Sequence, residues 1–260
     1  MWMVFSNDLS AAFLYTLVSS VVMKDGLLVI GTDPNTGASQ EYWDGGVKLA
    51  NFISDKMRSY AHSNGYAYKN PISKRNIYNH PRFSITGQPL VSSNVNDVAM
   101  TVLPNAPIDA DTGLPVPTIA VATDAGVSVI KDDGTVHSLT SGAIETISIN
   151  DRHEFITTPT HYSDTMLIKP LSTSDTNLNW NTGLRGYSYN PATGLYPFLS
   201  FRQANTVATP EGFNFTRNAG AGDGVTLMSE DFTNARKSLQ AVITSDYNTG
   251  WMNGDIKLAT

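Results

Sequence analysis

Carboxylates end three similar segments of this chain, and paired carboxylates can perform acid–base chemistry on sugars. Asp33, Asp124 and Asp246 close the segments LVIGTD, IAVATD and AVITSD. Two aspartates that flank a glycosidic bond can hydrolyse it, one as general acid and the other as base or nucleophile. The spacing in the sequence cannot pick out such a pair. The favoured interpretation is that each carboxylate caps the following turn by accepting backbone N–H groups.

Metal ligands are scarce in the sequence. Asp109-x-Asp111-x-Gly113 is similar to the start of a calcium loop, but Gly113 stands where another oxygen ligand is wanted. We therefore favour a plain Asx-turn loop, with Asp109 and Asp111 as a calcium alternative. His153-Glu154 lacks the second histidine of a zinc-protease helix, because position 157 is Thr. The chain has no cysteine. The sequence thus predicts no cofactor, no catalytic residue and no enzyme.

A basic, aromatic stretch separates Asp55 from Asp97, with no acidic residue between them. Basic and aromatic side chains together suit an acidic protein neighbour, single-stranded nucleic acid or an anionic glycan. The competing interpretation is an ordinary surface, with tyrosines packed on the domain and cations facing water. The candidate protein-contact residues are Arg58, Tyr66, Tyr68, Lys69, Lys74, Arg75 and Arg82.

Four further aromatic residues are candidates for stacking on a sugar ring. Aromatic side chains in β-repeat proteins also belong to the core, and that alternative stays open for each of them. The candidates are Tyr42, Trp43, Trp180 and Trp251.

The composition indicates a weakly charged β-protein. Of the 260 residues, 15% are charged, and the net charge is −6, which disfavours general attraction to nucleic acid. A polar surface with few charges is common in extracellular and virion β-proteins. The apolar segment 11–23 is too short and too polar to span a membrane, so we predict one or two buried strands there and no membrane insertion.

Strand and turn signals dominate the chain. Val, Ile, Thr and aromatic runs are bounded by Gly, Pro, Asn and Asp. The clearest predicted hairpin joins residues 126–131 and 135–139 through Asp132-Asp133-Gly134. Residues 47–60 suit a short helix or an irregular strand, and 231–240 suit a helical turn. Residues 104–117 form a proline-rich loop or linker.

The three similar segments begin at residues 28, 119 and 241, so they are 91 and 122 residues apart. These gaps match about two and three units of roughly 40–45 residues, the period of propeller blades. We predict an all-β fold, a β-propeller or propeller-like repeat with about five to seven short-stranded blades and little helix. Residues 1–260 would form a single domain.

Two short segments resemble a known class of proteins. Residues 118–136 (TIAVATDAGVSVIKDDGTV) and 246–258 (DYNTGWMNGDIKL) are similar to large structural proteins of tailed phages, which combine propellers with lectin-like domains. The resemblance implies a tail or fibre component located in the virion. Its partners would be other virion proteins, further copies of the chain and a host-surface glycan. A glycoside hydrolase or lyase on a propeller, and a secreted extracellular glycan-binding module, are the alternatives. Whether the chain is complete or part of a longer protein stays open.

Overall fold

This computed structural model describes rather more than half of the chain in detail. The described residues are 17–34, 45–74, 81–85, 89–140, 142–159, 165–171, 185–188, 205–209, 212–217, 224–229, 231, 237, 239–244 and 257–259. They form strands β1 to β19 and one 3-10 turn, η1 (Ile72–Lys74). The chain divides into two compact units, Met1–Ser141 with Ser174–Asn177 and Gly142–Thr173 with Leu178–Thr260.

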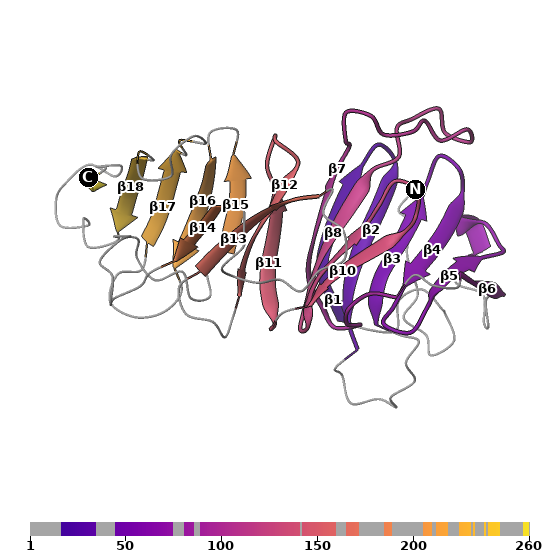
Figure 1. Cartoon of the computed structure of the whole chain (residues 1–260). Helices are drawn as coiled ribbons and strands as arrows, with labels where there is room; N and C mark the ends of the chain where they lie inside the picture. Colours follow the sequence, from indigo (N-terminus) through magenta and orange to yellow (C-terminus); the bar gives the residue numbers. More distant parts are fainter. Residues whose placement is uncertain are drawn as a thin grey trace. The chain divides into compact units, whose positions relative to one another are not determined.

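The first sheet is an antiparallel meander whose strands follow chain order (Figure 1). Tight turns make this order possible. Asp25 and Gly26 both have positive φ, 50° and 78°, as a two-residue hairpin turn requires. The strands are β1 (Leu17–Lys24), β2 (Leu27–Asp33), β3 (Gly46–Asn51), β4 (Lys56–Tyr60), β5 (Gly65–Tyr68) and β6 (Arg82–Ile85).

Turn chemistry decides the conformation of residues 47–60, which form the β3–β4 hairpin and not a helix. The Asn51 side chain accepts hydrogen bonds from the backbone N–H groups of Ile53 and Ser54, each at 3.0 Å. Asp55 then adopts a φ of 57°. An Asx turn followed by a left-handed residue reverses the chain before a helix can start.

The second sheet has the order β10-β9-β8-β7 and confirms the predicted hairpin. Lys131 N–H donates to the Thr135 carbonyl at 2.8 Å, and Gly134 takes a φ of 83°. The proline-rich segment 104–117 is a loop, as predicted, and is braced by an isolated bridge between Ile108 and Pro115. The strands are β7 (Val95–Thr101), β8 (Thr118–Thr123), β9 (Gly126–Ile130) and β10 (Val136–Thr140).

The core of this first unit lies between its two sheets. Val29 and Val47 of the first sheet pack in one cluster with Val95, Ile119 and Val121 of the second. A second cluster on other side chains of the first sheet contains Ile30, Ala50, Met57, Tyr68 and Ile72 of η1. Because β2 and β3 contribute to both clusters, their central residues are buried in continuous runs and do not alternate; these residues are mostly apolar, and the buried Lys48 of β3 is an exception.

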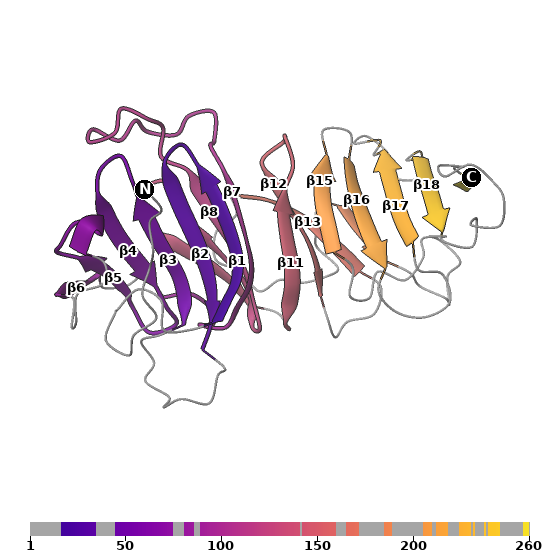
Figure 2. The same cartoon turned by 180° about the vertical axis from the view of Figure 1, so that it is seen from behind.

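Two more meander sheets make up the second unit (Figure 2). Their strands also pair antiparallel in chain order. The Ala208 N–H donates to Ser148 Oγ at 2.9 Å and so joins the two sheets. The strands are β11 (Ile144–Ile149), β12 (Glu154–Pro159), β13 (Thr165–Pro170), β14 (Arg185–Ser188), β15 (Asn205–Thr209), β16 (Gly212–Arg217), β17 (Gly224–Ser229), β18 (Leu239–Thr244) and β19 (Lys257–Ala259).

The predicted all-β, propeller-like repeat is confirmed, since successive meander sheets follow one another along the chain. The three similar segments fall in β2, β8 and β18, each in a different sheet. β2 and β8 are each the second strand of their sheets in chain order, whereas β18 is the fourth of five. The described residues form four sheets, fewer than the five to seven blades expected. The assignment of residues 1–260 to one domain stays a prediction.

One predicted strand is less buried than expected. Residues 17–23 do form a strand, β1, but Leu17, Val21 and Met23 are each more than half exposed. β1 is the edge strand of its sheet, and no described residue covers these side chains. Residues 11–16 lie outside the described part. Within the described part, no helix is long and apolar enough to cross a membrane.

The predicted helical turn at residues 231–240 falls largely outside the described residues. Its last two residues, Leu239 and Gln240, belong to strand β18.

Candidate functional site: a cavity at the turns of the first unit

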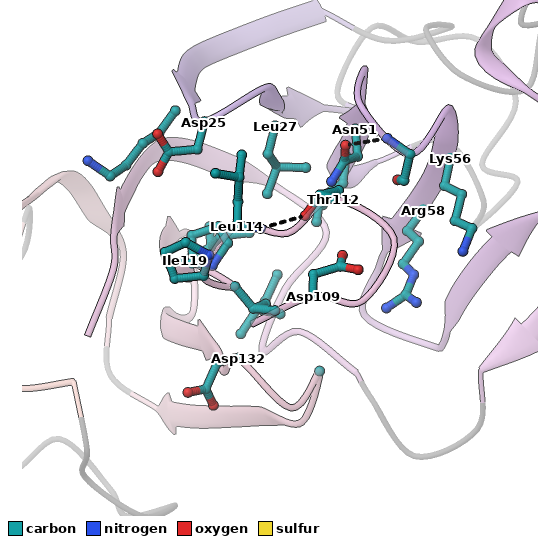
Figure 3. Close-up of a pocket in the computed structure, with 18 of the residues that line it drawn as sticks. Asp25, Leu27, Asn51, Lys56, Arg58, Asp109, Thr112, Leu114, Ile119 and Asp132 are labelled. Atoms are coloured by element: carbon teal, nitrogen blue, oxygen red, sulfur yellow. Dashed lines mark hydrogen bonds between the residues drawn. The ribbon is translucent and has the colours of Figure 1, made fainter. Parts of the chain in front are cut away.

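A cavity of about 360 Å³ lies where four connections of the first unit converge (Figure 3). They are the β1–β2 turn, the β3–β4 turn, the loop 104–117 between β7 and β8, and the β9–β10 turn. Antiparallel meanders place alternate turns at the same end of a sheet, so these connections can meet. This volume lies within the range of pockets that hold small ligands.

The inner wall of the cavity is apolar. Leu27 and Leu49 come from the first sheet, and Ile119 and Ile130 come from the second. Leu49, Ile119 and Ile130 also belong to the buried core cluster, with Tyr60 beside them. The cavity is therefore an opening onto the packed core, and its inner surface is held by strands.

The rim carries both signs of charge. It includes four cations and five carboxylates: Lys24, Lys56, Arg58, Lys131, Asp25, Asp109, Asp111, Asp132 and Asp133. Lys56 and Asp111 form an ion pair across this rim. The two side chains are 59% and 53% exposed, so the pair adds little stability, but it ties the loop 104–117 to β4.

Asp109 organises the loop through its side chain and its backbone carbonyl. Its Oδ1 accepts from the Asp111 N–H at 2.8 Å, and its carbonyl accepts from the Gly113 N–H at 2.8 Å. Gly113 has a φ of 70°, which explains a glycine at this position. The loop is thus the Asx turn that the sequence favours. Among the described residues, no group of three or more metal-ligating side chains comes together.

Arg58 is a rim cation without a side-chain partner. Its side chain is exposed on β4, and no hydrogen bond or ion pair joins it to another described residue; the same holds for the side chain of Lys24 at the end of β1. Figure 3 shows Arg58 beside Lys56, with Asp109 on the neighbouring loop. Arginine keeps its charge at every physiological pH, so the cavity presents a permanent guanidinium.

Two charged groups of the β9–β10 turn have shifted pKa values. Partial burial lowers the pKa of Lys131, and the nearby carboxylates of Asp132 and Asp133 oppose that shift. Hydrogen bonds lower the pKa of Asp133, since its Oδ1 accepts from the Thr135 hydroxyl at 2.6 Å and the Thr135 N–H at 2.8 Å. At neutral pH Asp133 is therefore a carboxylate held in place by the turn.

The structure separates the residues of the predicted contact surface. Arg58 lines the cavity, whereas Lys69 and Lys74 are exposed near η1. Tyr66 and Tyr68 are each only 7% exposed, so they contribute to the fold and offer little area to a partner. Arg82 begins β6, but its side chain lies outside the described part. Also outside it are Arg75, Tyr42, Trp43, Trp180 and Trp251.

One of the strand-ending aspartates, Asp124, behaves differently from the prediction. Asp124 accepts from the side-chain amides of Asn94, at 3.0 Å, and Asn96, at 2.9 Å. The cap of its own turn comes instead from Thr123, whose Oγ1 accepts from the Ala125 N–H at 3.3 Å. The capping role predicted for Asp124 is therefore wrong. Asp246 lies outside the described residues.

Sequence reasoning missed most of the cavity. Lys24, Asp25 and Lys131 were not singled out, and Asp132 and Asp133 were noted only as turn residues. The sequence signal for these residues was the pair of Asp-Gly turns at 25–26 and 133–134, because Asp-Gly marks the ends of hairpins. This signal does not predict which turns lie close together in the fold.

Comparisons with known proteins give no family. No family model matches the chain, and no curated protein matches it. Several solved structures are similar in part, and two of them have the following similarity. The Dos1 propeller is 13% identical with a TM-score of 0.40, over 93% of this chain and 52% of that chain. The extracellular domain of BT4673 from B. thetaiotaomicron is 10% identical with a TM-score of 0.35, over 87% of this chain and 40% of that chain. This chain thus spans about half the length of the first and less of the second.

Proposed function

We propose that this chain is a structural protein of a tailed-phage particle, a tail or fibre component, and that the cavity end of its first unit binds the host surface. The observation that carries the binding role is the cavity itself. Four turns from two rigid sheets surround an apolar wall and a charged rim. Loops on a rigid β scaffold are where binding residues concentrate.

The segment with the phage resemblance builds part of this cavity. Residues 118–136 comprise β8, β9 and the Lys131–Gly134 turn, and Ile119, Ile130 and the turn residues line the cavity. This coincidence supports the link between the virion resemblance and a binding role. The weakly charged composition, 15% charged residues, agrees with an extracellular location, in the virion or secreted.

The virion role has a direct test. Virus particles purified by density gradient from the source of the sequence are digested and analysed by mass spectrometry. We expect peptides of this chain at the copy number of a structural protein. A protein absent from intact particles, yet present in the culture medium, would contradict the virion role and favour the secreted binding module.

A glycoside hydrolase or lyase is the second candidate, because five aspartates line the cavity. Asp109 and Asp132 stand on different connections, as an acid and a base on either side of a substrate would. Release of reducing or unsaturated sugar ends from polysaccharides tests this candidate. Loss of release in both Asp109→Asn and Asp132→Asn, with unchanged melting temperature, would establish the enzyme. If no sugar ends are released from acidic or neutral polysaccharides, the enzyme candidate is rejected and the binding role is kept.

A further inference from the structure

We infer that the cavity binds an acidic sugar residue, a single carboxylate on a polyhydroxylated ring, with Arg58 holding the carboxylate. This inference rests on the proposed binding role of the cavity and names its ligand class. It is carried by three features of the lining: a guanidinium without an internal partner, carboxylates on separate connections, and an apolar wall.

Arg58 supplies the anion-binding group. The neighbouring Lys56 is already paired with Asp111, whereas no described residue neutralises Arg58. A guanidinium forms two parallel hydrogen bonds with a carboxylate, and such charge-assisted pairs are about twice as strong as neutral ones. A ligand that enters the cavity removes water from Arg58, so a ligand without an anionic group would leave that charge uncompensated.

The carboxylates restrict what else the ligand carries. Asp25 comes from the β1–β2 turn and Asp132 from the β9–β10 turn, and Figure 3 shows them apart from Arg58 around the cavity. No hydrogen bond or ion pair joins Asp25 to another described residue. Carboxylates accept hydrogen bonds and repel anions, so they favour hydroxyl groups and disfavour a phosphate or sulfate dianion.

The apolar wall suits the C–H face of a sugar ring. Leu27 and Leu114 are partly exposed lining residues from the first sheet and from the loop 104–117. The volume of about 360 Å³ accommodates a ligand of one or two rings. One carboxylate, several hydroxyls and one apolar face together describe a uronic or sialic acid residue.

Calorimetric titration of the full chain tests the ligand class. The probes are glucuronic acid, galacturonic acid and N-acetylneuraminic acid, with glucose and glucose 6-phosphate as comparisons. We expect at least one acidic sugar to bind at least about tenfold more tightly than either comparison, a difference of about 1.4 kcal/mol. Equal affinity for glucose, or tighter binding of glucose 6-phosphate, would overturn the inference.

Variants then test the assignment of Arg58. Arg58→Gln should weaken binding of the acidic sugar at least about tenfold, and Arg58→Lys should give an intermediate loss because the charge remains without the planar fork. Lys237→Gln, which changes an exposed cation of the second unit that does not line the cavity, is the matched control and should bind like the parent. Melting temperatures should agree across the set, since both side chains are exposed. Unchanged binding by Arg58→Gln would overturn the assignment.

The two proposals fail in different ways. A chain that is abundant in particles but binds no acidic sugar keeps the virion role and loses this ligand class. A chain that is absent from particles but binds an acidic sugar through Arg58 keeps this ligand class and loses the virion role.

Discussion

The Thr32 hydroxyl donates a hydrogen bond to the carbonyl oxygen of Gly46, 2.9 Å away, and Thr123 makes the same bond to Gly126 at the same distance. In both cases the threonine is fully buried near the end of one strand, and the glycine opens the next strand in register with it. The third similar segment differs, since its threonine stands one place earlier and Thr244 lies opposite Gly224 of the preceding strand β17. The two more similar segments thus encode a joint between neighbouring strands.

We expect Thr32→Val and Thr123→Val each to destabilise the protein by about 1–3 kcal/mol. Valine has nearly the shape of threonine but leaves a buried glycine carbonyl without this hydrogen bond. Urea unfolding followed by circular dichroism measures the change. Thr140→Val, at an exposed position, is the control and should change stability by under about 0.5 kcal/mol. Equal stability of all three variants would show that the joint contributes nothing.

Gly46→Ala should disrupt the first unit. Gly46 has a φ of 104°, and a Cβ there would collide with the backbone carbonyl of Tyr60 on the neighbouring strand. A backbone obstacle cannot move aside as a side chain can. Gly113→Ala is the matched control, because its φ is 70° but no atom lies within 4 Å of the added Cβ. It should cost only about 1 kcal/mol. Soluble yield and thermal unfolding separate the two, and similar losses would contradict the steric argument.

The local pattern predicted the strands well because their signals are local. Apolar runs such as residues 119–123 and the Asp-Gly turn at 133–134 fix where a strand lies and where it reverses. Residues 47–60 were ambiguous, because the spacing of their apolar residues fits a short helix about as well as an irregular strand. The turn at Asn51 makes these residues a hairpin, and the Asn51 side chain contributes only two hydrogen bonds to it.

The cavity was not predictable in the same way. Its lining comes from four connections between residues 24 and 134, and only the packing of two sheets brings them together. The tyrosines of β5 show the related difficulty. Tyr66 and Tyr68 alternate with small residues, as exposed aromatic residues of a binding strand would, yet both are buried. Their burial depends on the elements that cover this face of the sheet, and Tyr68 packs in one cluster with Ile72 of η1.

Asp133 should give a pH-dependent contribution to stability. Hydrogen bonds from Thr135 lower its pKa below the ordinary 3.8, so the folded state favours the carboxylate. That contribution is present above the unfolded pKa and is lost as the pH falls through the lower folded pKa. Asp133→Ala should therefore be less stable than the parent at pH 7, by under about 0.5 kcal/mol because the side chain is exposed to solvent, and the difference should shrink at pH 3.

A double-mutant cycle identifies the source of this effect. Thr135→Val removes the hydroxyl donor to Asp133, so its cost should overlap with that of Asp133→Ala in the double variant. Additive costs, or a loss for Asp133→Ala that is unchanged at pH 3, would contradict the role of these hydrogen bonds.

The exposed cations near η1 carry the assembly prediction. Lys69 and Lys74 remain candidates for contact with another copy of the chain or another virion protein, since both are exposed. We expect the chain to form a homo-oligomer, and Lys69→Glu/Lys74→Glu to weaken it several-fold with an unchanged melting temperature, because rim charges affect association more than folding. Light scattering after size exclusion measures this. Lys237→Glu, exposed in the second unit, is the control. A monomeric parent, or equal assembly of both variants, would contradict the prediction.

Lys131 should destabilise the protein at neutral pH, in the opposite sense to Asp133. Partial burial lowers the pKa of Lys131 below 10.5 in the folded protein. Between this lower pKa and the pKa of Lys131 in the unfolded chain, the unfolded chain binds more protons than the folded one, so the free energy of unfolding rises with pH. Lys131→Met removes the buried charge and keeps most of the apolar stem. It should therefore be more stable than the parent at pH 7, by under about 1 kcal/mol because the side chain is partly exposed and the carboxylates of Asp132 and Asp133 offset the burial.

The stability advantage of Lys131→Met should diminish as the pH rises towards 10.5, which urea unfolding at pH 7, 8.5 and 10 would measure. Every other group is shared, so the difference between the two proteins reports Lys131. Lys69→Met, at an exposed position, should show no such trend. A parent more stable than Lys131→Met at pH 7 would mean that the attraction of the two aspartates outweighs the cost of burial.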